Sequence, residues 1–310
     1  MPVRLTRRSF LGAALALPLA SPAADRGVLI DTHIHLFAKD RERFPYHPNA
    51  PYQPAPQDLA DYSKFVQASG LSHTIIVHPE PYQDDHRYLE YCFAHEPSPG
   101  CFKGTILLDA FAKDTPERMS KLVERNKGRI VALRVHAMNA PGEPPTTSGA
   151  ITSRDLRDPR MKAMWEAARD LGLAIQMHFR PHHAPEIAEL QSKVPGSTVI
   201  LDHIGRAGMG TWEDFQAVLA LSQDPRCYLK VSGVRYSSQQ DYPYLDAKKY
   251  LQPAYQAFGA DRLIAGGLGA TAKDLEANLQ MLDQLFDFAP ESDRAKIRGL
   301  TARRLFGFDA

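Results

Sequence analysis

Eight short apolar runs recur along the chain, and most of them are almost continuously hydrophobic. Strands that are buried on both faces have this pattern, because helices cover both sides of a parallel sheet. The expected strands are residues 27–33, 72–77, 102–108, 130–135, 173–178, 198–202, 227–231 and 262–265.

Stretches with helical spacing of apolar residues separate these runs, as with Leu59, Phe65 and Val66 in residues 57–69. The expected helices are residues 57–69, 84–93, 116–125, 159–171, 184–193, 211–221, 247–258, 274–288 and 291–305. Eight alternating βα units predict an α/β fold, a single-domain (β/α)8 TIM-like barrel over residues 25–310. A doubly wound open sheet is the alternative. It would require a glycine-rich phosphate turn after the first strand, where this chain has histidines.

Residues 1–24 have a different pattern. Arg4, Arg7 and Arg8 precede a short apolar run over residues 10–19, and small residues follow it. This order is typical of a signal peptide, and the run is too short to span a bilayer. The paired arginines followed by Ser-Phe-Leu are typical of a twin-arginine signal. We therefore expect a periplasmic or exported protein without a stable membrane anchor.

Composition narrows the choice of partners. The 310 residues include 37 basic and 36 acidic side chains, a net charge of +1. A balance of this kind gives no indication of nucleic-acid binding and favours a small-molecule substrate. It does not indicate the oligomeric state. The three cysteines lack metal-ligand spacing, so we expect no disulfide framework, although one pair could form outside the cytoplasm.

The sequence DTHIHLF, residues 31–37, places two histidines two positions apart after an apolar run. Alternate residues of a strand share a face, so Asp31, His33 and His35 should point the same way. Such an arrangement presents either a pair of metal ligands, or one ligand and a catalytic imidazole.

Further polar residues stand at the carboxyl ends of other expected strands. These ends point into one shared pocket in a barrel, so polar residues there indicate a catalytic or binding role. Two irregular segments, residues 38–56 and 137–153, follow strands on the same face, where they could cover a substrate. The strand-end residues include His78 and Glu80, Arg134 and His136, His178 and Arg180, Asp202, His203 and Arg206, and Lys230 and Ser232.

Several of these stretches resemble the amidohydrolase-related branch of the amidohydrolase superfamily, and within it the 2-pyrone-4,6-dicarboxylate lactonases and related lactone hydrolases. The resemblance covers residue 31 to about residue 267. It is carried by DTHIHLF with the following FPYHPNAPYQP, and by RIVALRVH, LGLAIQMHFR, VILDHIGRAG, CYLKVSGV and DRLIAGG. It implies a distorted (β/α)8 barrel and hydrolysis of a lactone or an amide-like bond.

The resemblance also implies roles for individual residues. His33, His35 and His178 match a metal-ligand set, and His203 matches a histidine that ligates metal or polarises the substrate carbonyl. These four are the expected catalytic residues. Five further residues are expected to bind the substrate, and the arginines among them could hold a carboxylate bidentately. They are Arg134, Arg180, Arg206, His136 and His78.

The chain departs from the family pattern after the eighth expected strand. The pattern there carries an aspartate as general base, whereas this chain reads AGGLGA and has Leu268 at that position. A leucine cannot accept a proton, and loss of a general base typically costs about 10²–10⁴-fold in rate.

Three outcomes remain open. Another group could replace the base, with Glu80, Asp31, His136 and His203 as candidates, or a divalent metal could activate water. Zinc or manganese is the expected metal, and a metal-independent lactonase is the other form of this hypothesis. The reaction could instead be a decarboxylation or lyase reaction, or the chain could be an inactive exported binding protein.

Overall fold

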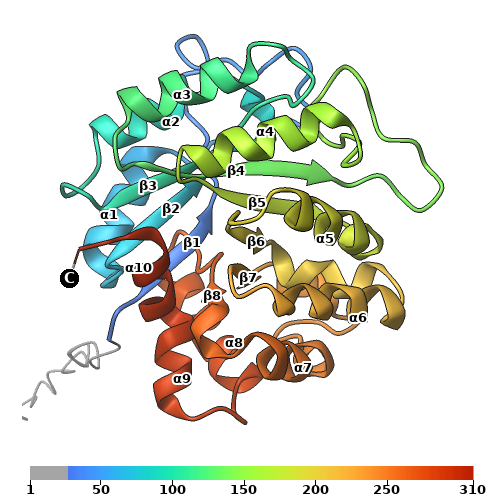
Figure 1. The fold of residues 1–310 in the computed structure, drawn as a ribbon. Helices are drawn as coiled ribbons and strands as arrows, with labels where there is room; N and C mark the ends of the chain where they lie inside the picture. The colour runs from blue at the N-terminus through green and yellow to red at the C-terminus, as the bar shows by residue number, and fades with distance from the viewer. Residues whose placement is uncertain (1–26, 310) are drawn as a thin grey trace, which may run out of the picture.

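The computed structural model describes residues 27–309, and the expected signal segment lies outside this range. Eight parallel strands pair in the order β1 to β8 around a barrel (Figure 1). Because the strands follow one another without a reversal of order, the barrel prediction is confirmed and the doubly wound alternative is wrong. The strands are β1 (Ile30–Ile34), β2 (His73–Val77), β3 (Phe102–Leu107), β4 (Ile130–Ala137), β5 (Ala174–Phe179), β6 (Val199–Leu201), β7 (Cys227–Val231) and β8 (Leu263–Ala265).

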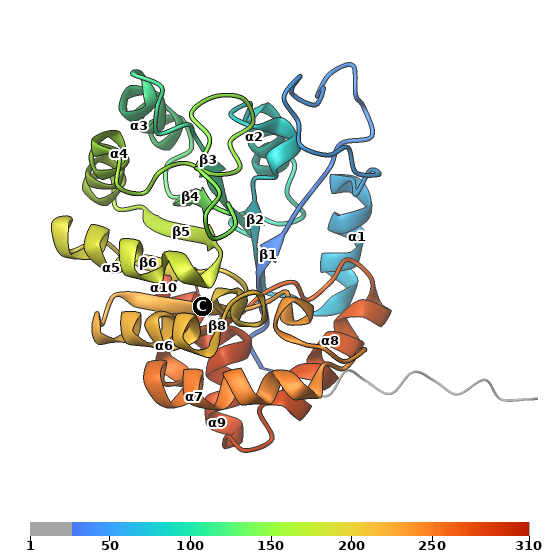
Figure 2. The same cartoon turned by 90° about the vertical axis from the view of Figure 1, so that its right-hand side faces the viewer.

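Helices surround the strands on the outside, as the two views show (Figures 1 and 2). They are α1 (Leu59–Ser69), α2 (Arg87–Ala94), α3 (Thr115–Arg125), α4 (Pro159–Asp170), α5 (Ala184–Lys193), α6 (Trp212–Ala220), α7 (Lys248–Phe258), α8 (Ala272–Leu285), α9 (Glu291–Ala295) and α10 (Thr301–Phe306). The expected helix over residues 291–305 is interrupted by a π-helical turn, Lys296–Leu300. Gly299 of that turn packs so closely on the Val28 backbone that a Cβ would overlap the Val28 carbonyl.

Side chains inside the barrel form layers, because alternate residues of each strand point inward. The lowest layer is apolar and includes Ile30, Ile200 and Ile264, with Phe306 and Phe308 from the C-terminal segment packed against it. On β4 and β5 the sequence then turns polar at every second residue. Arg134 lies beside Gln176, and His136 lies beside His178 at the carboxyl ends. The interior of the barrel therefore changes from an apolar base to a polar mouth.

The seam between β8 and β1 is joined by side chains. Thr32 Oγ1 donates to the Ala265 carbonyl at 2.7 Å, and Lys230 Nζ donates to the Thr32 carbonyl at 2.9 Å. Asp31 accepts from the backbone amides of Gly267 at 2.7 Å and Leu268 at 2.9 Å. The loop after β8 is therefore fixed to the histidine-bearing strand β1.

Both long loops are held at the barrel mouth. Phe37 and Gln57 exchange backbone hydrogen bonds at the base of the first loop, and Ile151 of the second donates to Gln83 Oε1 at 2.6 Å. Their role in covering substrate stays a prediction. The three cysteines are buried and unpaired. Within residues 27–309 no helix combines the length and apolar character needed to cross a membrane.

Candidate active site

Five of the expected histidines meet at the mouth of the barrel. The ring centroids of His33 and His35 lie 5.0 Å apart, and those of His33 and His203 lie 4.7 Å apart. His178 links this set to His136, with centroid distances of 5.6 Å to His203 and 4.9 Å to His136. The rings come from β1, β4, β5 and the turn after β6, so the barrel alone brings them together.

Glu80, His136 and His178 form the first of two potential ligand groups in this cluster. Glu80 Oε1 lies 3.0 Å from His136 Nδ1 and 3.6 Å from His178 Nδ1. Both ring nitrogens of His136 are buried; Nδ1 faces the Glu80 carboxylate, and Nε2 has no hydrogen-bond partner among residues 27–309. Burial opposes ionisation of Glu80, but His136, His178 and Arg134 together hold the pKa of its carboxyl well below the usual range. The group is therefore a partly buried carboxylate beside buried imidazole rings with nitrogens available to a ligand.

His33, Asp202 and His203 form the second group. Asp202 is fully buried and accepts from Arg134 Nε at 3.1 Å and Gln176 Nε2 at 3.0 Å. Lys230 Nζ lies 3.3 Å from its other oxygen, and His33 Nδ1 lies 3.6 Å from that oxygen. Two buried cations already neutralise Asp202, so a divalent ion is disfavoured here.

Buried imidazoles at this mouth are neutral near pH 7. Burial lowers the pKa of His33 and His178 well below the ordinary value, and it lowers that of His203 to about 3. Burial also lowers the pKa of His35 to about 4. His35 Nδ1 lies 2.7 Å from the Val77 carbonyl, which can only accept a hydrogen bond. The neutral ring therefore carries its proton on Nδ1 and presents Nε2 as an acceptor.

A left-handed backbone turn orients two of these side chains. His203, Ile204, Gly205 and Arg206 all have φ between 51° and 60°. Left-handed geometry costs about 1–2 kcal/mol per non-glycine residue, and consecutive residues rarely adopt it. At Gly205 a Cβ would lie 2.7 Å from Val218 Cγ1, so glycine is needed there for packing as well. Strain of this size at an imidazole cluster indicates that the positions of His203 and Arg206 matter for function.

The other expected substrate-binding residues divide between the cluster and its surroundings. Arg206 Nη2 donates to His178 Nε2 at 2.5 Å, so Arg206 belongs to the cluster. Arg134 instead donates to Asp202 and forms an ion pair with it. Arg180 lies nearer the rim, where its Nε donates to the Met138 carbonyl at 3.0 Å. His78 is turned away from the mouth. Its Nε2 bonds to the Gln83 carbonyl at 2.9 Å, and its ring packs on the ring of His86.

The expected metal-ligand set of His33, His35 and His178 is not one of the two groups. His178 lies with Glu80 and His136, while His33 lies with Asp202. His35 uses Nδ1 for the Val77 carbonyl, so only its Nε2 is available. The residues of the first group come from the turn after β2 and from β4 and β5.

Asp31 cannot serve as the missing base. It is fully buried, and its two oxygens accept from three backbone amides, those of His33, Gly267 and Leu268. Burial raises the pKa of Asp31, and these three hydrogen bonds oppose the rise. Its role is to hold the seam of the barrel.

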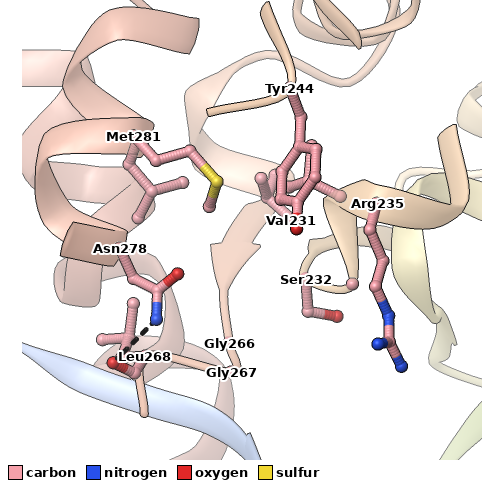
Figure 3. Close-up of a pocket in the computed structure, with 12 residues that line it drawn as sticks. Val231, Ser232, Arg235, Tyr244, Gly266, Gly267, Leu268, Asn278 and Met281 are labelled. Carbon is pink, nitrogen blue, oxygen red and sulfur yellow. Dashed lines mark hydrogen bonds between the residues drawn. The ribbon is translucent and has the colours of Figure 1, made fainter. Parts of the chain in front are cut away.

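Leu268 lines a pocket of about 180 Å³ beside the histidine cluster, whose walls carry both apolar side chains and polar ones such as Ser232 and Arg235. Figure 3 shows its carbonyl accepting from the Asn278 amide, with Met281 and Tyr244 further up the walls. The leucine side chain is 1% exposed and belongs to the main hydrophobic core. The position of the family aspartate has thus become part of an apolar wall.

We expect Leu268→Asp to destabilise the protein without raising its hydrolytic rate. A carboxylate there would be buried without a cation and would lie beside Asp31, which costs about 3–5 kcal/mol. Leu268→Met is the matched control and should cost less than about 1.5 kcal/mol. Urea unfolding midpoints measure both effects, and faster lactone hydrolysis by the aspartate variant would contradict the expectation.

Two contributors at the site were not expected from the sequence. Gln176 supplies an amide to Asp202, and its position two residues before His178 on β5 is the signal that could have revealed it. Tyr236 packs below the Arg206 guanidinium, with Arg206 Cζ 4.0 Å from the ring centroid. It follows β7 in a 3-10 turn, Val234–Ser237, and no spacing in the sequence identifies it.

Fold and site together define a (β/α)8-barrel protein with an imidazole–carboxylate centre at the carboxyl ends of its strands. Residues 30–308 match the family model described as amidohydrolase, and the chain belongs to that family. The expected resemblance is confirmed at this level.

Curated relatives include a 4-sulfomuconolactone hydrolase of Rhizobium radiobacter, 25% identical over 293 residues and 89% of each chain. An L-fucono-1,5-lactonase of Burkholderia ambifaria is 24% identical, covering 90% of this chain and 96% of the relative. A solved structure described as a putative 2-pyrone-4,6-dicarboxylic acid hydrolase from Pseudomonas putida has a TM-score of 0.71 and 24% identity, over 91% and 98% of the two chains.

Metal ions occur in related folds. An amidohydrolase from Burkholderia multivorans was solved with bound zinc; its TM-score is 0.67 and its identity 16%, over 91% of this chain and 100% of that chain. A dihydroxybenzoic acid decarboxylase from Polaromonas was solved with manganese; its TM-score is 0.60 and its identity 16%, over 90% and 97% of the chains. The described part of this chain has two groups of side chains that could act as metal ligands, Glu80, His136 and His178, and His33, Asp202 and His203.

Proposed function

We propose that this protein hydrolyses a small lactone or related cyclic ester, through attack of water on a polarised carbonyl. The observation that carries the proposal is the meeting of two imidazole–carboxylate groups at one barrel mouth in an amidohydrolase chain. The lactone hydrolase names of the relatives support this substrate class.

Glu80, His136 and His178 fit a divalent metal best. They offer one anionic oxygen and neutral nitrogens, and Nε2 of His136 has no competing hydrogen bond among residues 27–309. Zinc and manganese accept this mixture of ligands. An ion held there would act as a Lewis acid on the scissile carbonyl.

The remaining side chains supply proton transfer and orientation. His33 is a neutral imidazole with the Asp202 carboxylate 3.6 Å from its Nδ1, so it can take a proton from water and be stabilised as imidazolium. His203 Nδ1 is fixed by Ser232 Oγ at 2.9 Å, which leaves Nε2 to donate to the developing oxyanion. His35 Nε2 lies next to His33 as an acceptor for the attacking water.

Arg206 is the best candidate to bind a carboxylate on the substrate. Its guanidinium lies at the mouth against His178 and Tyr236, and no carboxylate neutralises it in an ion pair among residues 27–309. A guanidinium with free donors suits bidentate recognition of a carboxylate.

A non-oxidative decarboxylase is the second candidate. Leu268 favours it, because loss of carbon dioxide from an aromatic acid requires no base to activate water. A panel of lactones and hydroxybenzoic acids, assayed together with elemental analysis of the purified protein, separates the two. We expect lactone turnover and one zinc or manganese per chain. Turnover of only the aromatic acids would replace the first proposal, and an intact fold without any turnover would favour a binding protein.

We also propose export through the twin-arginine pathway, supported by the paired arginines and the short apolar run before residue 25. A chain with Arg7→Lys and Arg8→Lys should accumulate in the cytoplasm, while the unchanged chain should appear in the periplasmic fraction. Equal distribution of the two chains would refute the proposal.

A further inference from the structure

Tyr236 stands at the mouth of the site between two guanidinium groups. Arg206 Cζ lies 4.0 Å from its ring centroid, and Arg235 Cζ lies 4.8 Å from it. Arg235 Nη2 also donates to the Tyr236 hydroxyl at 2.9 Å. Two cations therefore face one phenol, which is an arrangement that stabilises a phenolate.

Two glycines leave the space that this ring needs to lie against the histidine cluster. A Cβ at Gly233 would lie 2.8 Å from His203 Nδ1 and 2.9 Å from Tyr236 Cδ2. A Cβ at Gly208 would lie 2.6 Å from the Tyr236 carbonyl oxygen. The rings of His203 and Tyr236 can consequently approach to 5.5 Å between centroids. The backbone on both sides of Tyr236 is thus shaped for this approach.

We propose that Tyr236 is a catalytic residue, the general acid that protonates the leaving oxygen when the lactone ring opens. This inference rests on the proposed function. In the proposed reaction His203 donates to the carbonyl oxygen of the lactone. The ring oxygen is bonded to the same carbon, so the leaving oxygen also lies close to His203. Tyr236 packs on His203 and is only partly buried, so its hydroxyl lies on a wall that a substrate can reach.

The proton balance of the step is closed. Water attacks the carbonyl carbon and gives one proton to His33. The bond between the carbonyl carbon and the ring oxygen then breaks, and the departing alkoxide takes the phenolic proton of Tyr236. The phenolate regains a proton from solvent, and His33 releases its own. One lactone and one water thus give one hydroxy acid, which ionises to a carboxylate.

The charges around Tyr236 suit this role. Burial opposes ionisation of the phenol, but Arg235 and Arg206 outweigh burial and lower the pKa of Tyr236. A phenol that loses its proton more readily is a better donor to an alkoxide. The contacts of Tyr236 place its hydroxyl, two guanidinium groups and the His203 ring on one wall of the site.

The test compares Tyr236→Phe with the unchanged protein on two six-membered lactones, δ-valerolactone and 3,4-dihydrocoumarin. The first releases an alkoxide, whose conjugate acid has a pKa near that of water, about 15.7. The second releases a phenolate, whose conjugate acid has a pKa of about 10 and needs little help from an acid. We expect kcat for δ-valerolactone to fall by about 10²-fold or more, and kcat for dihydrocoumarin to be almost unchanged.

Tyr244→Phe is the matched control, because it removes the same atom from the neighbouring pocket and should affect both lactones equally and little. Equal losses on the two lactones for Tyr236→Phe would show a packing role and overturn the proposal. An unchanged protein that opens neither lactone would overturn the proposed function and this role with it. These two failures are distinguishable, because only the first leaves measurable wild-type turnover.

Discussion

Glu80→Gln should remove the bound metal and nearly all hydrolytic activity while leaving the fold intact. Glu80 is the only carboxylate within the group that also contains His136 and His178. An amide keeps the shape of the side chain but lacks the negative charge that favours a divalent ion. Loss of a residue that merely supports a ligand costs about 10–100-fold in metal affinity or activity, so loss of a ligand should cost more.

Glu186→Gln provides the matched control. Its side chain has the same exposure as that of Glu80, 14%, and it also lies against a histidine, His183 Nδ1, at 2.6 Å. Elemental analysis and kcat should be unchanged in this variant. Full metal content in Glu80→Gln would show that the ion binds elsewhere, for example at His33 and His203.

The strand pattern predicted the barrel well because buried parallel strands leave a distinct apolar signature. All eight strands lie within the expected runs, to within two or three residues. The same alternation predicted that His33 and His35 share a face, and their ring centroids lie 5.0 Å apart at the mouth. The spacing of residues along the strands was therefore enough to predict that several histidines lie at the barrel mouth.

The sequence pattern did not predict which residues far apart in the chain contact one another at the mouth. His78 stands at a strand end like the others, yet the Gln83 carbonyl draws its ring away. Glu80 joins His136 and His178 only because the turn after β2 folds over the barrel mouth. The left-handed turn at His203 depends on packing against Val218 and Tyr236, which no short sequence pattern encodes.

Asp202→Asn should have the largest effect on stability of any change at the mouth. Burial opposes ionisation of Asp202, but Lys230 and Arg134 hold the pKa of its carboxyl well below the usual range. Lys230 and Arg134 are buried, so removing the negative charge leaves two cations in the barrel without the carboxylate that pairs with both of them. Breaking a buried pair in this way costs about 3–5 kcal/mol. Activity should fall as well, because His33 loses the carboxylate that stabilises its protonated form.

Two further variants separate charge from the loss of a hydrogen bond. Gln176→Leu removes one neutral donor to Asp202 and should cost only about 1–3 kcal/mol. Lys230→Met combined with Asp202→Asn removes a cation together with the anion and should recover part of the lost stability, because residues in one network couple by about 0.5–3 kcal/mol. Chemical denaturation measures all three variants. If the double variant were less stable than Asp202→Asn alone, Lys230 would stabilise the barrel chiefly through its bond to the Thr32 carbonyl at the β8–β1 seam, and the charge balance proposed for Asp202 would be wrong.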